Sequence, residues 1–444
     1  MSSLRAPILS YAAAAGQNAA WQADISYSIT LYDYSCGEGA VHVMPMPELM
    51  ALIDGMKRSF PWYERLLESG DPSLEALPLM TASVLEAHYY SADNPLAERT
   101  DLYGYRTSGT SSGRRKTIYY SERDEEAYLR IKLDIFKTIL EPYGYRTAVA
   151  DMGTGHAEAT AVQVFRQLGM DVHSFSFRLP IEQHIERLER IKPEVLYTMP
   201  SIMDRILLAA EDPAAFGIKH VVLVGETASP GWIARVAQRL NIGPDRVTDT
   251  LGSIEIGTIA YFSHRHGRYL FAEGIIPEGI GTEALGANLE PLSEGEQVLV
   301  LTSTVRESFP ALRYVTYDVV RDLRPIEADG VLRPSFQSIV KRIGPDLKHG
   351  EKISIYDIDN IVYRHLSDAG VRVSVADNAL SVHVSSPLAT ADVLGRIKED
   401  LELYIPEIHA MIQGGVLDGI RVIAEPFDDS LSRTSVKNKK IYYT

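Results

Sequence analysis

The chain has 444 residues, 45% of them hydrophobic and 23% charged, which is enough for two or three domains with sizeable cores. Its formal net charge of −15 argues against a nucleic-acid partner, which usually requires a basic footprint, and no run of about 18 apolar residues predicts a membrane span. The single cysteine, Cys36, excludes an internal disulfide and a multi-cysteine zinc site, and without a secretory pattern at the start of the chain it favours a reducing cytoplasm.

The first predicted elements are helices between residues 47 and 90, where apolar residues recur at helical spacing. A central section then alternates strands with helices. Strands are predicted there at residues 147–151, 194–198 and 220–225. The last of these is a continuous apolar run, as expected for a strand buried on both faces, and Ser229 and Pro230 after it are typical of a helix start. This order predicts an α/β fold with a mostly parallel sheet covered by helices.

The pattern changes after about residue 340. Residues 341–352 are polar and carry two glycines, which is typical of a hinge. Beyond the hinge the sequence predicts a small α+β unit. Its helices are expected near residues 357–365 and 390–404, and its strands at 371–375, 380–384 and 420–424. We therefore expect a large N-terminal domain over 1–340 and a small C-terminal domain over 341–444.

A loop of small hydroxyl residues, followed by Arg114, Arg115 and Lys116, has the clearest chemical signature in the chain. Its two glycines let backbone N–H groups turn toward one point. Charge-assisted bonds to phosphate are worth roughly 1.5–3 kcal/mol each, so the loop suits a polyphosphate. The loop residues are Thr107, Ser108, Gly109, Thr110, Ser111, Ser112 and Gly113.

This loop differs from two similar motifs. It lacks the Gly-Lys-Ser/Thr ending of a Walker A loop. Gly109, Ser111 and Gly113 match the G-x-S-x-G nucleophile elbow, but that elbow requires a helix after the serine, whereas residues 116–120 read as a strand. A hairpin over a ligand fits better, and an ordinary Ser/Gly surface turn remains the alternative.

Several short motifs follow one another in a recognisable order. They are Leu77-Pro-Leu-Met-Thr81, the hydroxyl loop, Gly225-Glu-Thr227, Leu251-Gly-Ser-Ile-Glu255, Arg313-Tyr-Val-Thr-Tyr-Asp318 and Ser432-Arg-Thr-Ser-Val-Lys437. In this order they resemble the acyl-adenylate-forming superfamily, specifically its phenylacetate-CoA ligase-like branch, over nearly the whole chain. The resemblance implies that a carboxylate attacks the α-phosphate of ATP to give an acyl-adenylate. A thiol, usually coenzyme A, then displaces AMP, and a mobile C-terminal domain rotates between the steps.

The resemblance also assigns roles to residues. Glu255 would hold Mg²⁺, a hard cation that prefers carboxylate and phosphate oxygen. The Lys437 ammonium would stabilise charge at the α-phosphate and carboxylate oxygens, an effect typically worth a factor of about 10²–10³ in rate. A solvated loop acid and a solvated basic tail are the respective alternatives. Other contacts to ATP or AMP are implied for the hydroxyl loop, Lys116, Gly225, Glu226, Thr227, Gly252, Ser253 and the ribose-binding Asp318, which could also be a turn aspartate.

Some positions depart from the superfamily pattern. Ile254 stands where a threonine would contact the α-phosphate, and Ser253 is the nearest replacement. The hinge motif is broken, so that Arg342 and Asp346 are its nearest matches. The phosphate loop is one residue longer than usual, as in auxin acyl-amido synthetases. Residues 263–266 offer two histidines but no cysteine, so we expect no zinc.

The acid pocket is expected where relatives build theirs, around His156, Tyr197, Ile256 and Tyr261. Small residues beside aromatic ones can leave a flat slot that suits an aryl or arylacetic acid, since aromatic faces give offset stacking of about 0.5–1.5 kcal/mol. A benzoate-like acid is the favoured class. His156 is either a partner for a ring substituent or a histidine satisfied at the start of a helix.

Three functions are compatible with these residues. The first is an aryl-CoA ligase, which the chain length and the C-terminal pattern favour. The second adenylates the acid but transfers it to an amine or a carrier-protein thiol, which the longer loop favours. The third is a binding protein that holds an adenylate without turnover, which Ile254 and the broken hinge favour. The implied partners are ATP, a small aromatic acid, coenzyme A and a downstream acyl carrier protein, with a homodimer by analogy.

Overall fold

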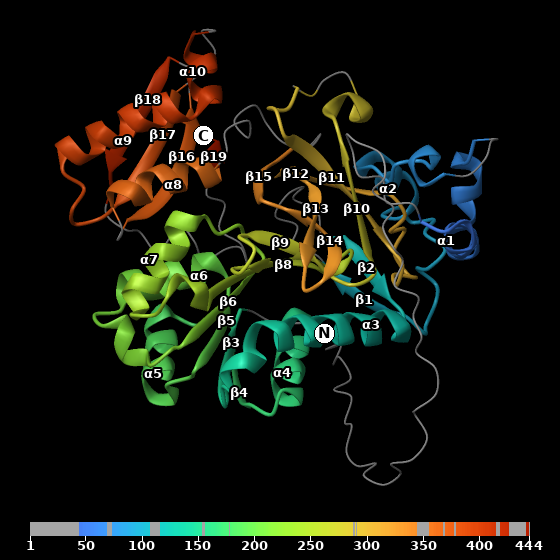
Figure 1. The fold of residues 1–444 in the computed structure, drawn as a ribbon, viewed down its shortest axis with the longest axis horizontal. Helices are drawn as coiled ribbons and strands as arrows, with labels where there is room; N and C mark the ends of the chain where they lie inside the picture. The colour runs from blue at the N-terminus through green and yellow to red at the C-terminus, as the bar shows by residue number, and fades with distance from the viewer. Residues whose placement is uncertain are drawn as a thin grey trace, which may run out of the picture.

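A computed structural model describes residues 44–68, 73–106, 116–152, 156–176, 178–286, 289, 291–343, 355–366, 369–376, 379–413, 418–425 and 441–443. Figure 1 shows the arrangement of these parts. The helices are α1 (Met46–Ser59), α2 (Ala82–His88), α3 (Glu122–Leu140), α4 (His156–Gln167), α5 (Ile181–Ile191), α6 (Pro200–Ala209), α7 (Pro230–Leu240), α8 (Ile355–His365), α9 (Ala391–Tyr404) and α10 (Pro406–Gln413).

The centre of the protein is a mixed sheet. From one edge to the other its strands are β13 (Arg324–Ala328), β14 (Val331–Phe336), β9 (Arg268–Phe271), β8 (Gly257–Ser263), β7 (Val247–Ser253), β6 (His220–Val224), β5 (Val195–Thr198), β3 (Thr147–Asp151) and β4 (Asp171–Phe175). The strands from β4 to β7 are parallel, whereas β8, β9, β14 and β13 continue the sheet in antiparallel pairs. The predicted α/β fold and its parallel strands are confirmed.

Helices cover both faces of the parallel strands. Ala148, Tyr197 and Val222 belong to the core that α3 and α4 close. Their neighbours Val149 and Leu196 point the other way, into the core closed by α5, α6 and α7. The inner strands β5 and β6 are therefore buried on both sides, which explains their largely apolar sequences, whereas the edge strand β4 is mostly exposed.

A second, antiparallel sheet and a hairpin lie beside the main sheet. The sheet consists of β10 (Ile275–Ile280), β11 (Glu296–Ser303), β12 (Tyr314–Arg321) and β15 (Ser338–Arg342), and the hairpin of β1 (Tyr103–Arg106) and β2 (Thr117–Tyr120). The region predicted as helices, residues 47–90, contains α1, α2 and two short 3-10 helices. These elements lie at the outer side of the second sheet (Figure 1).

The C-terminal sheet is separate from the other two. Its strands are β18 (Gly419–Ala424), β17 (Ala379–Ser385), β16 (Gly370–Ala376) and β19 (Ile441–Tyr443). Its helix α8 packs on α7, where the Gly231 N–H donates to Asn360 Oδ1 at 3.1 Å and the Arg235 guanidinium lies 5.6 Å from the ring centroid of Tyr363. This contact seats the small α+β unit beside the parallel end of the main sheet.

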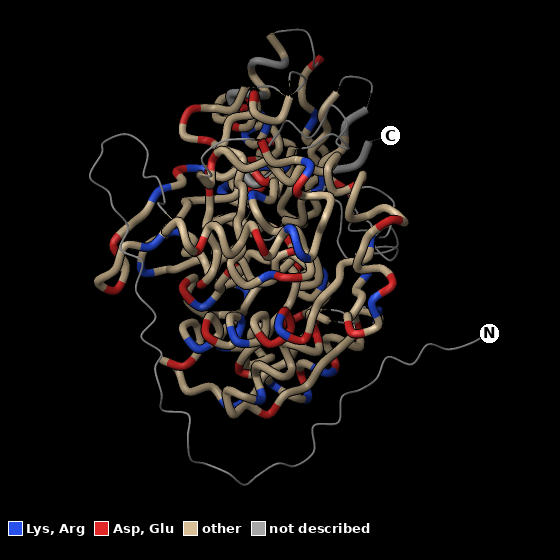
Figure 2. The backbone as a smooth tube through the Cα atoms, turned by 90° about the vertical axis from the view of Figure 1, so that its right-hand side faces the viewer, with Lys and Arg blue, Asp and Glu red and all other residues tan. Residues whose placement is uncertain are grey.

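Charged residues of both signs are spread over the described chain. Figure 2 shows Lys and Arg positions interspersed with Asp and Glu positions. None of the helices that the structure describes is both long enough and apolar enough to traverse a lipid bilayer.

We predict opposite effects of two glycine-to-alanine changes. A Cβ on Gly231 would lie 2.9 Å from Tyr363 Cβ, so Gly231→Ala should lower the free energy of unfolding by about 1–3 kcal/mol by forcing α7 and α8 apart. A Cβ on the exposed Gly395 in α9 would have no neighbour within 4 Å, so Gly395→Ala should raise the free energy of unfolding by about 0.5–1 kcal/mol. Denaturant titration measures both values, and a Gly231→Ala protein as stable as the parent would contradict the packing.

Candidate active site

The β1–β2 hairpin brackets the predicted phosphate loop. The strands are antiparallel, so the chain enters and leaves the loop at one place; loop residues 107–113 lie outside the described residues. Lys116, which precedes β2, pairs with Glu86 at 2.5 Å and lies 4.4 Å from the ring centroid of Tyr90. A cavity of about 160 Å³ between α2 and β2 is lined by the same three residues. The hairpin thus places a cation and a cavity beside the loop.

A buried ion pair joins the segment between β11 and β12 to the start of α3. Arg306 and Asp124 meet at 2.5 Å, with side chains that are 3% and 0% exposed. Asp124 also accepts hydrogen bonds from the backbone N–H groups of Ser121, Glu307 and Ser308. Burial opposes the charge of this carboxylate, but the guanidinium and the backbone donors outweigh burial and hold the pKa of Asp124 below its ordinary value of 3.8.

The same arginine fixes the loop that carries Glu255. Arg306 Nε donates to the Glu255 carbonyl at 3.0 Å, and its Nη2 donates to the Tyr119 carbonyl at 2.7 Å. The guanidinium lies 3.7 Å from the ring centroid of Tyr120, whose hydroxyl donates to the Ile254 carbonyl at 2.7 Å. One buried cation therefore holds β2 and the Glu255 loop in a fixed relation.

Glu255, the proposed magnesium ligand, lies close enough to Tyr90 and Tyr314 for its charge to act on their hydroxyls. Burial first, and the negative charge of Glu255 second, raise the pKa values of the Tyr90 and Tyr314 hydroxyls. Within the described ranges no cluster of three or more His, Cys, Asp or Glu side chains could enclose a metal. Mg²⁺ usually binds one or two carboxylates together with substrate phosphates, so a single carboxylate near the phosphate hairpin fits this ion.

Asp318 and Arg342 lie opposite each other on β12 and β15. Arg342 Nε is 3.8 Å from Asp318 Oδ1, and the Asp318 N–H donates to Thr316 Oγ1 at 3.0 Å. The structure thus brings the proposed ribose-binding residue and a proposed hinge residue together. The other hinge residue, Asp346, and the proposed catalytic lysine, Lys437, lie outside the described residues.

Gly225, Glu226 and Thr227, which the resemblance places as a ledge beside adenine, follow β6. Gly225 has a φ of +84°, and Thr227 is half-buried. The Glu226 carboxylate accepts hydrogen bonds from the Ser201 N–H at 2.8 Å and the Ser201 hydroxyl at 2.9 Å, so its side chain is engaged at the start of α6. Because Ser201 engages the Glu226 carboxylate, the backbone of residues 225–227 is the part of this ledge that can flank a ligand.

Gly252 and Ser253 end β7 at the same edge of the sheet. They pair with Thr258 and Gly257 of β8, and the Ser253 hydroxyl accepts from the Ile256 N–H at 3.2 Å. This bond closes the turn that carries Glu255. Carboxyl ends of parallel strands meet at this edge, which is where ligands bind in open α/β sheets.

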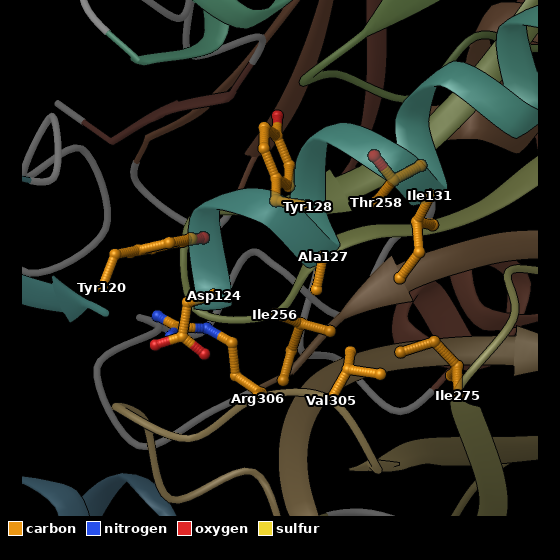
Figure 3. Close-up of a pocket in the computed structure, with 10 residues that line it drawn as sticks. All are labelled: Tyr120, Asp124, Ala127, Tyr128, Ile131, Ile256, Thr258, Ile275, Val305 and Arg306. Carbon is orange, nitrogen blue, oxygen red and sulfur yellow. The ribbon is translucent and has the colours of Figure 1, made fainter. Parts of the chain in front are cut away.

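The proposed acid pocket is crowded by tyrosine rings. His156 Nε2 and Glu125 Oε2 share a hydrogen bond of 2.7 Å. The ring centroid of His156 lies within 5.1 Å of the ring centroids of Tyr105, Tyr120 and Tyr128. Ile256 lines a cavity of about 10 Å³ with two of these tyrosines. In Figure 3 Tyr120, Asp124 and Arg306 form one end of this cavity and isoleucine and valine side chains the other.

The other two proposed acid-pocket residues lie deeper or farther along the sheet. Tyr197 is 2% exposed and packs on Phe136 and Phe165 behind the sheet. Tyr261 lies in the middle of β8, opposite Thr250. The structure therefore brings His156 and Ile256 to the same group of tyrosines and leaves Tyr261 away from it.

Several residues at this site have no local signature in the sequence. Arg306 and Asp124 are far apart in the chain and match no motif. Lys132 is also unexpected, because it is a charged residue on the buried face of α3. Its only sequence signal is its spacing, seven residues after Glu125, which puts both on one face of the helix.

Comparisons with known proteins give three matches of different strength. Residues 348–428 match a family model described as the fumarate–diaminopropanoate ligase C-terminal domain. The chain is 36% identical over 373 residues to the fumarate–(S)-2,3-diaminopropanoate ligase of Enterobacter agglomerans, covering 83% of this chain and 93% of that protein. It is 23% identical over 298 residues to the phenylacetate-coenzyme A ligase of Thermus thermophilus, covering 61% and 63%.

Solved structures share the fold. The crystal structure of 2-hydroxyisobutyryl-CoA ligase in the postadenylation state aligns with a TM-score of 0.67 and 18% identity over 90% of this chain and 88% of that one. At this identity the match establishes the arrangement of sheets and helices, including the small C-terminal unit.

We predict that Asp124→Asn lowers the free energy of unfolding by about 3–5 kcal/mol, because it leaves the buried Arg306 charge uncompensated. Denaturant titration measures the loss. Glu126→Gln, which removes an exposed carboxylate from the same helix, is the matched control and should change little.

The loss of stability caused by Asp124→Asn should be largest near neutral pH and should shrink as the pH falls. The folded pKa of Asp124 lies below the ordinary value of 3.8, so the carboxylate stabilises the fold above that value and this contribution is lost as the pH falls through the folded pKa. Equal stability of the variant and the parent near neutral pH would contradict the ion pair.

Proposed function

This chain belongs to the acyl-adenylate-forming ligases, in the family of the fumarate–(S)-2,3-diaminopropanoate ligase, and we propose that it joins a small dicarboxylic acid to an amine while ATP is cleaved to AMP and pyrophosphate. The observation that carries the proposal is 36% identity to that ligase over 83% of this chain. The crowded tyrosine cluster near Ile256 adds support, because a short acid needs less space than an aromatic one.

In the proposed first step, a carboxylate oxygen of the acid attacks the α-phosphorus of ATP. The new oxygen–phosphorus bond gives an acyl-adenylate, and pyrophosphate leaves. Glu255 would hold Mg²⁺, which neutralises phosphate charge when bound. The loop over 107–113 and Lys116 would bind the β- and γ-phosphates, and Asp318 the ribose hydroxyls. The Lys437 ammonium would stabilise the charge that develops between acid and phosphorus.

In the proposed second step, an amine nitrogen attacks the acyl carbon. The bond from that carbon to the AMP oxygen breaks, an amide forms, and the amine proton passes to water. A rigid Glu255 loop matters in both steps, since groups that are already oriented need no reorganisation as charge develops. Arg306, which holds this loop through its backbone carbonyl, would act as a positioning residue.

Transfer to coenzyme A, with an aryl or other acid, is the second candidate. It is supported by the similarity to the phenylacetate-coenzyme A ligase of Thermus thermophilus, at the lower identity of 23%. The acceptor decides between the candidates, because both share the adenylation step.

We predict an amide product. With ATP, Mg²⁺ and fumarate, (S)-2,3-diaminopropanoate should give AMP and a fumaroyl amide by mass spectrometry, and coenzyme A should react more slowly by about tenfold or more, since an acceptor site shaped for one nucleophile excludes another. Formation of fumaroyl-CoA at an equal or higher rate would reject the amine and favour the second candidate.

We predict that Lys437→Ala lowers the adenylation rate by about 10²–10³-fold, because it removes a cation that acts mainly in the transition state. Exchange of labelled pyrophosphate into ATP isolates this step from the acceptor. Lys439→Ala, two residues away in the same basic segment, is the control and should retain most of the activity. A Lys437→Ala rate within a factor of two of the parent would remove the lysine from the mechanism.

A further inference from the structure

The buried face of α3 carries two polar contacts to α4. At one, Glu125 bonds to His156. At the other, Lys132 Nζ donates to Thr160 Oγ1 at 3.1 Å and to the Ala157 carbonyl at 3.3 Å. Glu125 is thus engaged by the histidine, and among the described residues no carboxylate lies within ion-pair distance of the lysine.

Lys132 is deeply buried. It is 2% exposed, and its ammonium lies 5.0 Å from the ring centroid of Tyr197, 5.5 Å from that of Tyr128 and 5.7 Å from that of Phe136. Burial lowers the pKa of Lys132 to about 7. A methionine or leucine would fill this position without that penalty, so the charge has no structural advantage that the described contacts explain.

Lys132 and the segment after Glu255 share one aromatic neighbour, Tyr128. The Lys132 ammonium lies 5.5 Å from the centroid of this ring, and a Cβ on Gly257, which follows the Glu255 loop and has a φ of +100°, would lie 2.8 Å from Tyr128 Cδ2. Tyr128 also lines the cavity at Ile256 (Figure 3). A short acid whose reacting carboxylate lies at the Glu255 loop would extend along this ring toward Lys132.

We propose that Lys132, oriented by Thr160 and enclosed by Tyr128 and Tyr197, binds the carboxylate of the acid that does not react. The assignment rests on the proposed function in one respect, that the acid is a short dicarboxylate. Two neutral acceptors orient the ammonium, and a carboxylate supplies the missing negative charge in a site of low dielectric. Lys132 thereby selects a dicarboxylate over a monocarboxylate of equal length.

The test compares fumarate with crotonate, which has the same trans skeleton but a methyl group in place of the second carboxylate. In pyrophosphate exchange, Lys132→Met should lower kcat/KM for fumarate by about tenfold to a hundredfold, the worth of a charge-assisted contact, and leave that for crotonate unchanged or higher. Lys137→Met, which removes an exposed lysine from the same helix, should leave the ratio of the two acids unchanged.

Equal losses for both acids, or no loss for fumarate, would overturn the assignment. The unfolding midpoint of Lys132→Met should not fall below that of the parent, because the cost of burying the ammonium is removed. If this variant does not fold, the parent protein decides alone: it should prefer fumarate to crotonate by about tenfold or more, and equal use of the two acids would overturn the site.

Failure of the proposed function is distinguishable from failure of this site. If no acid supports exchange in the parent, the ligase assignment fails, and calorimetric titration with fumarate then tests the site directly. Binding to the parent that Lys132→Met weakens by about tenfold or more supports it. Absent binding, or equal binding to both proteins, rejects it.

Discussion

The buried ion pair between Arg306 and Asp124 is the interaction on which the site depends. Two desolvated charges stabilise a fold only when further hydrogen bonds satisfy them. Here three backbone N–H groups donate hydrogen bonds to the Asp124 carboxylate, and the Arg306 guanidinium donates to the carbonyls of Glu255 and Tyr119. The ion pair therefore holds the loop that carries the proposed magnesium ligand in one position.

Helix α3 connects the proposed chemistry to the proposed substrate selection. Its first turn supplies Asp124 and Glu125, and the next two turns supply Tyr128 and Lys132. Beside this helix, strand β7 of the main sheet ends in the turn that carries Glu255. Arg306 holds this turn through a hydrogen bond to the Glu255 carbonyl. In the proposed reaction a single rigid helix would set the distance between the reacting carboxylate and the opposite end of the acid, which a loop could not do with the same precision.

Sequence patterns predicted the parts of the fold that local rules control. The predicted strand at 147–151 and the continuous apolar run at 220–225 correspond to β3 and β6, and Ser229 caps α7 as expected, accepting a hydrogen bond from the Trp232 N–H at 3.2 Å. The antiparallel strands from β8 to β15 were not assigned in advance, because their pairings join distant segments and their apolar pattern is irregular. The order of short motifs predicted the superfamily correctly, while the phenylacetate-CoA ligase-like branch is matched only at 23% identity.

Substrate selection could not be predicted from the sequence for a physical reason. The proposed pocket was expected to be a flat aromatic slot because small residues and tyrosines alternate there. In the fold Tyr105, Tyr120 and Tyr128 gather around His156 instead, and Lys132 contacts α4 from the same helix that carries Tyr128. Neither contact has a local signature, since each joins segments that are far apart in the sequence.

The most direct test of the account follows oxygen from the acid to the nucleotide. The reaction is run with ATP, (S)-2,3-diaminopropanoate and fumarate carrying ¹⁸O in both carboxylates, and the phosphates are examined by mass spectrometry. Attack on the α-phosphorus followed by amide formation leaves one carboxylate oxygen on AMP, so AMP should carry a single ¹⁸O. Unlabelled AMP, or label in orthophosphate together with ADP, would contradict an acyl-adenylate.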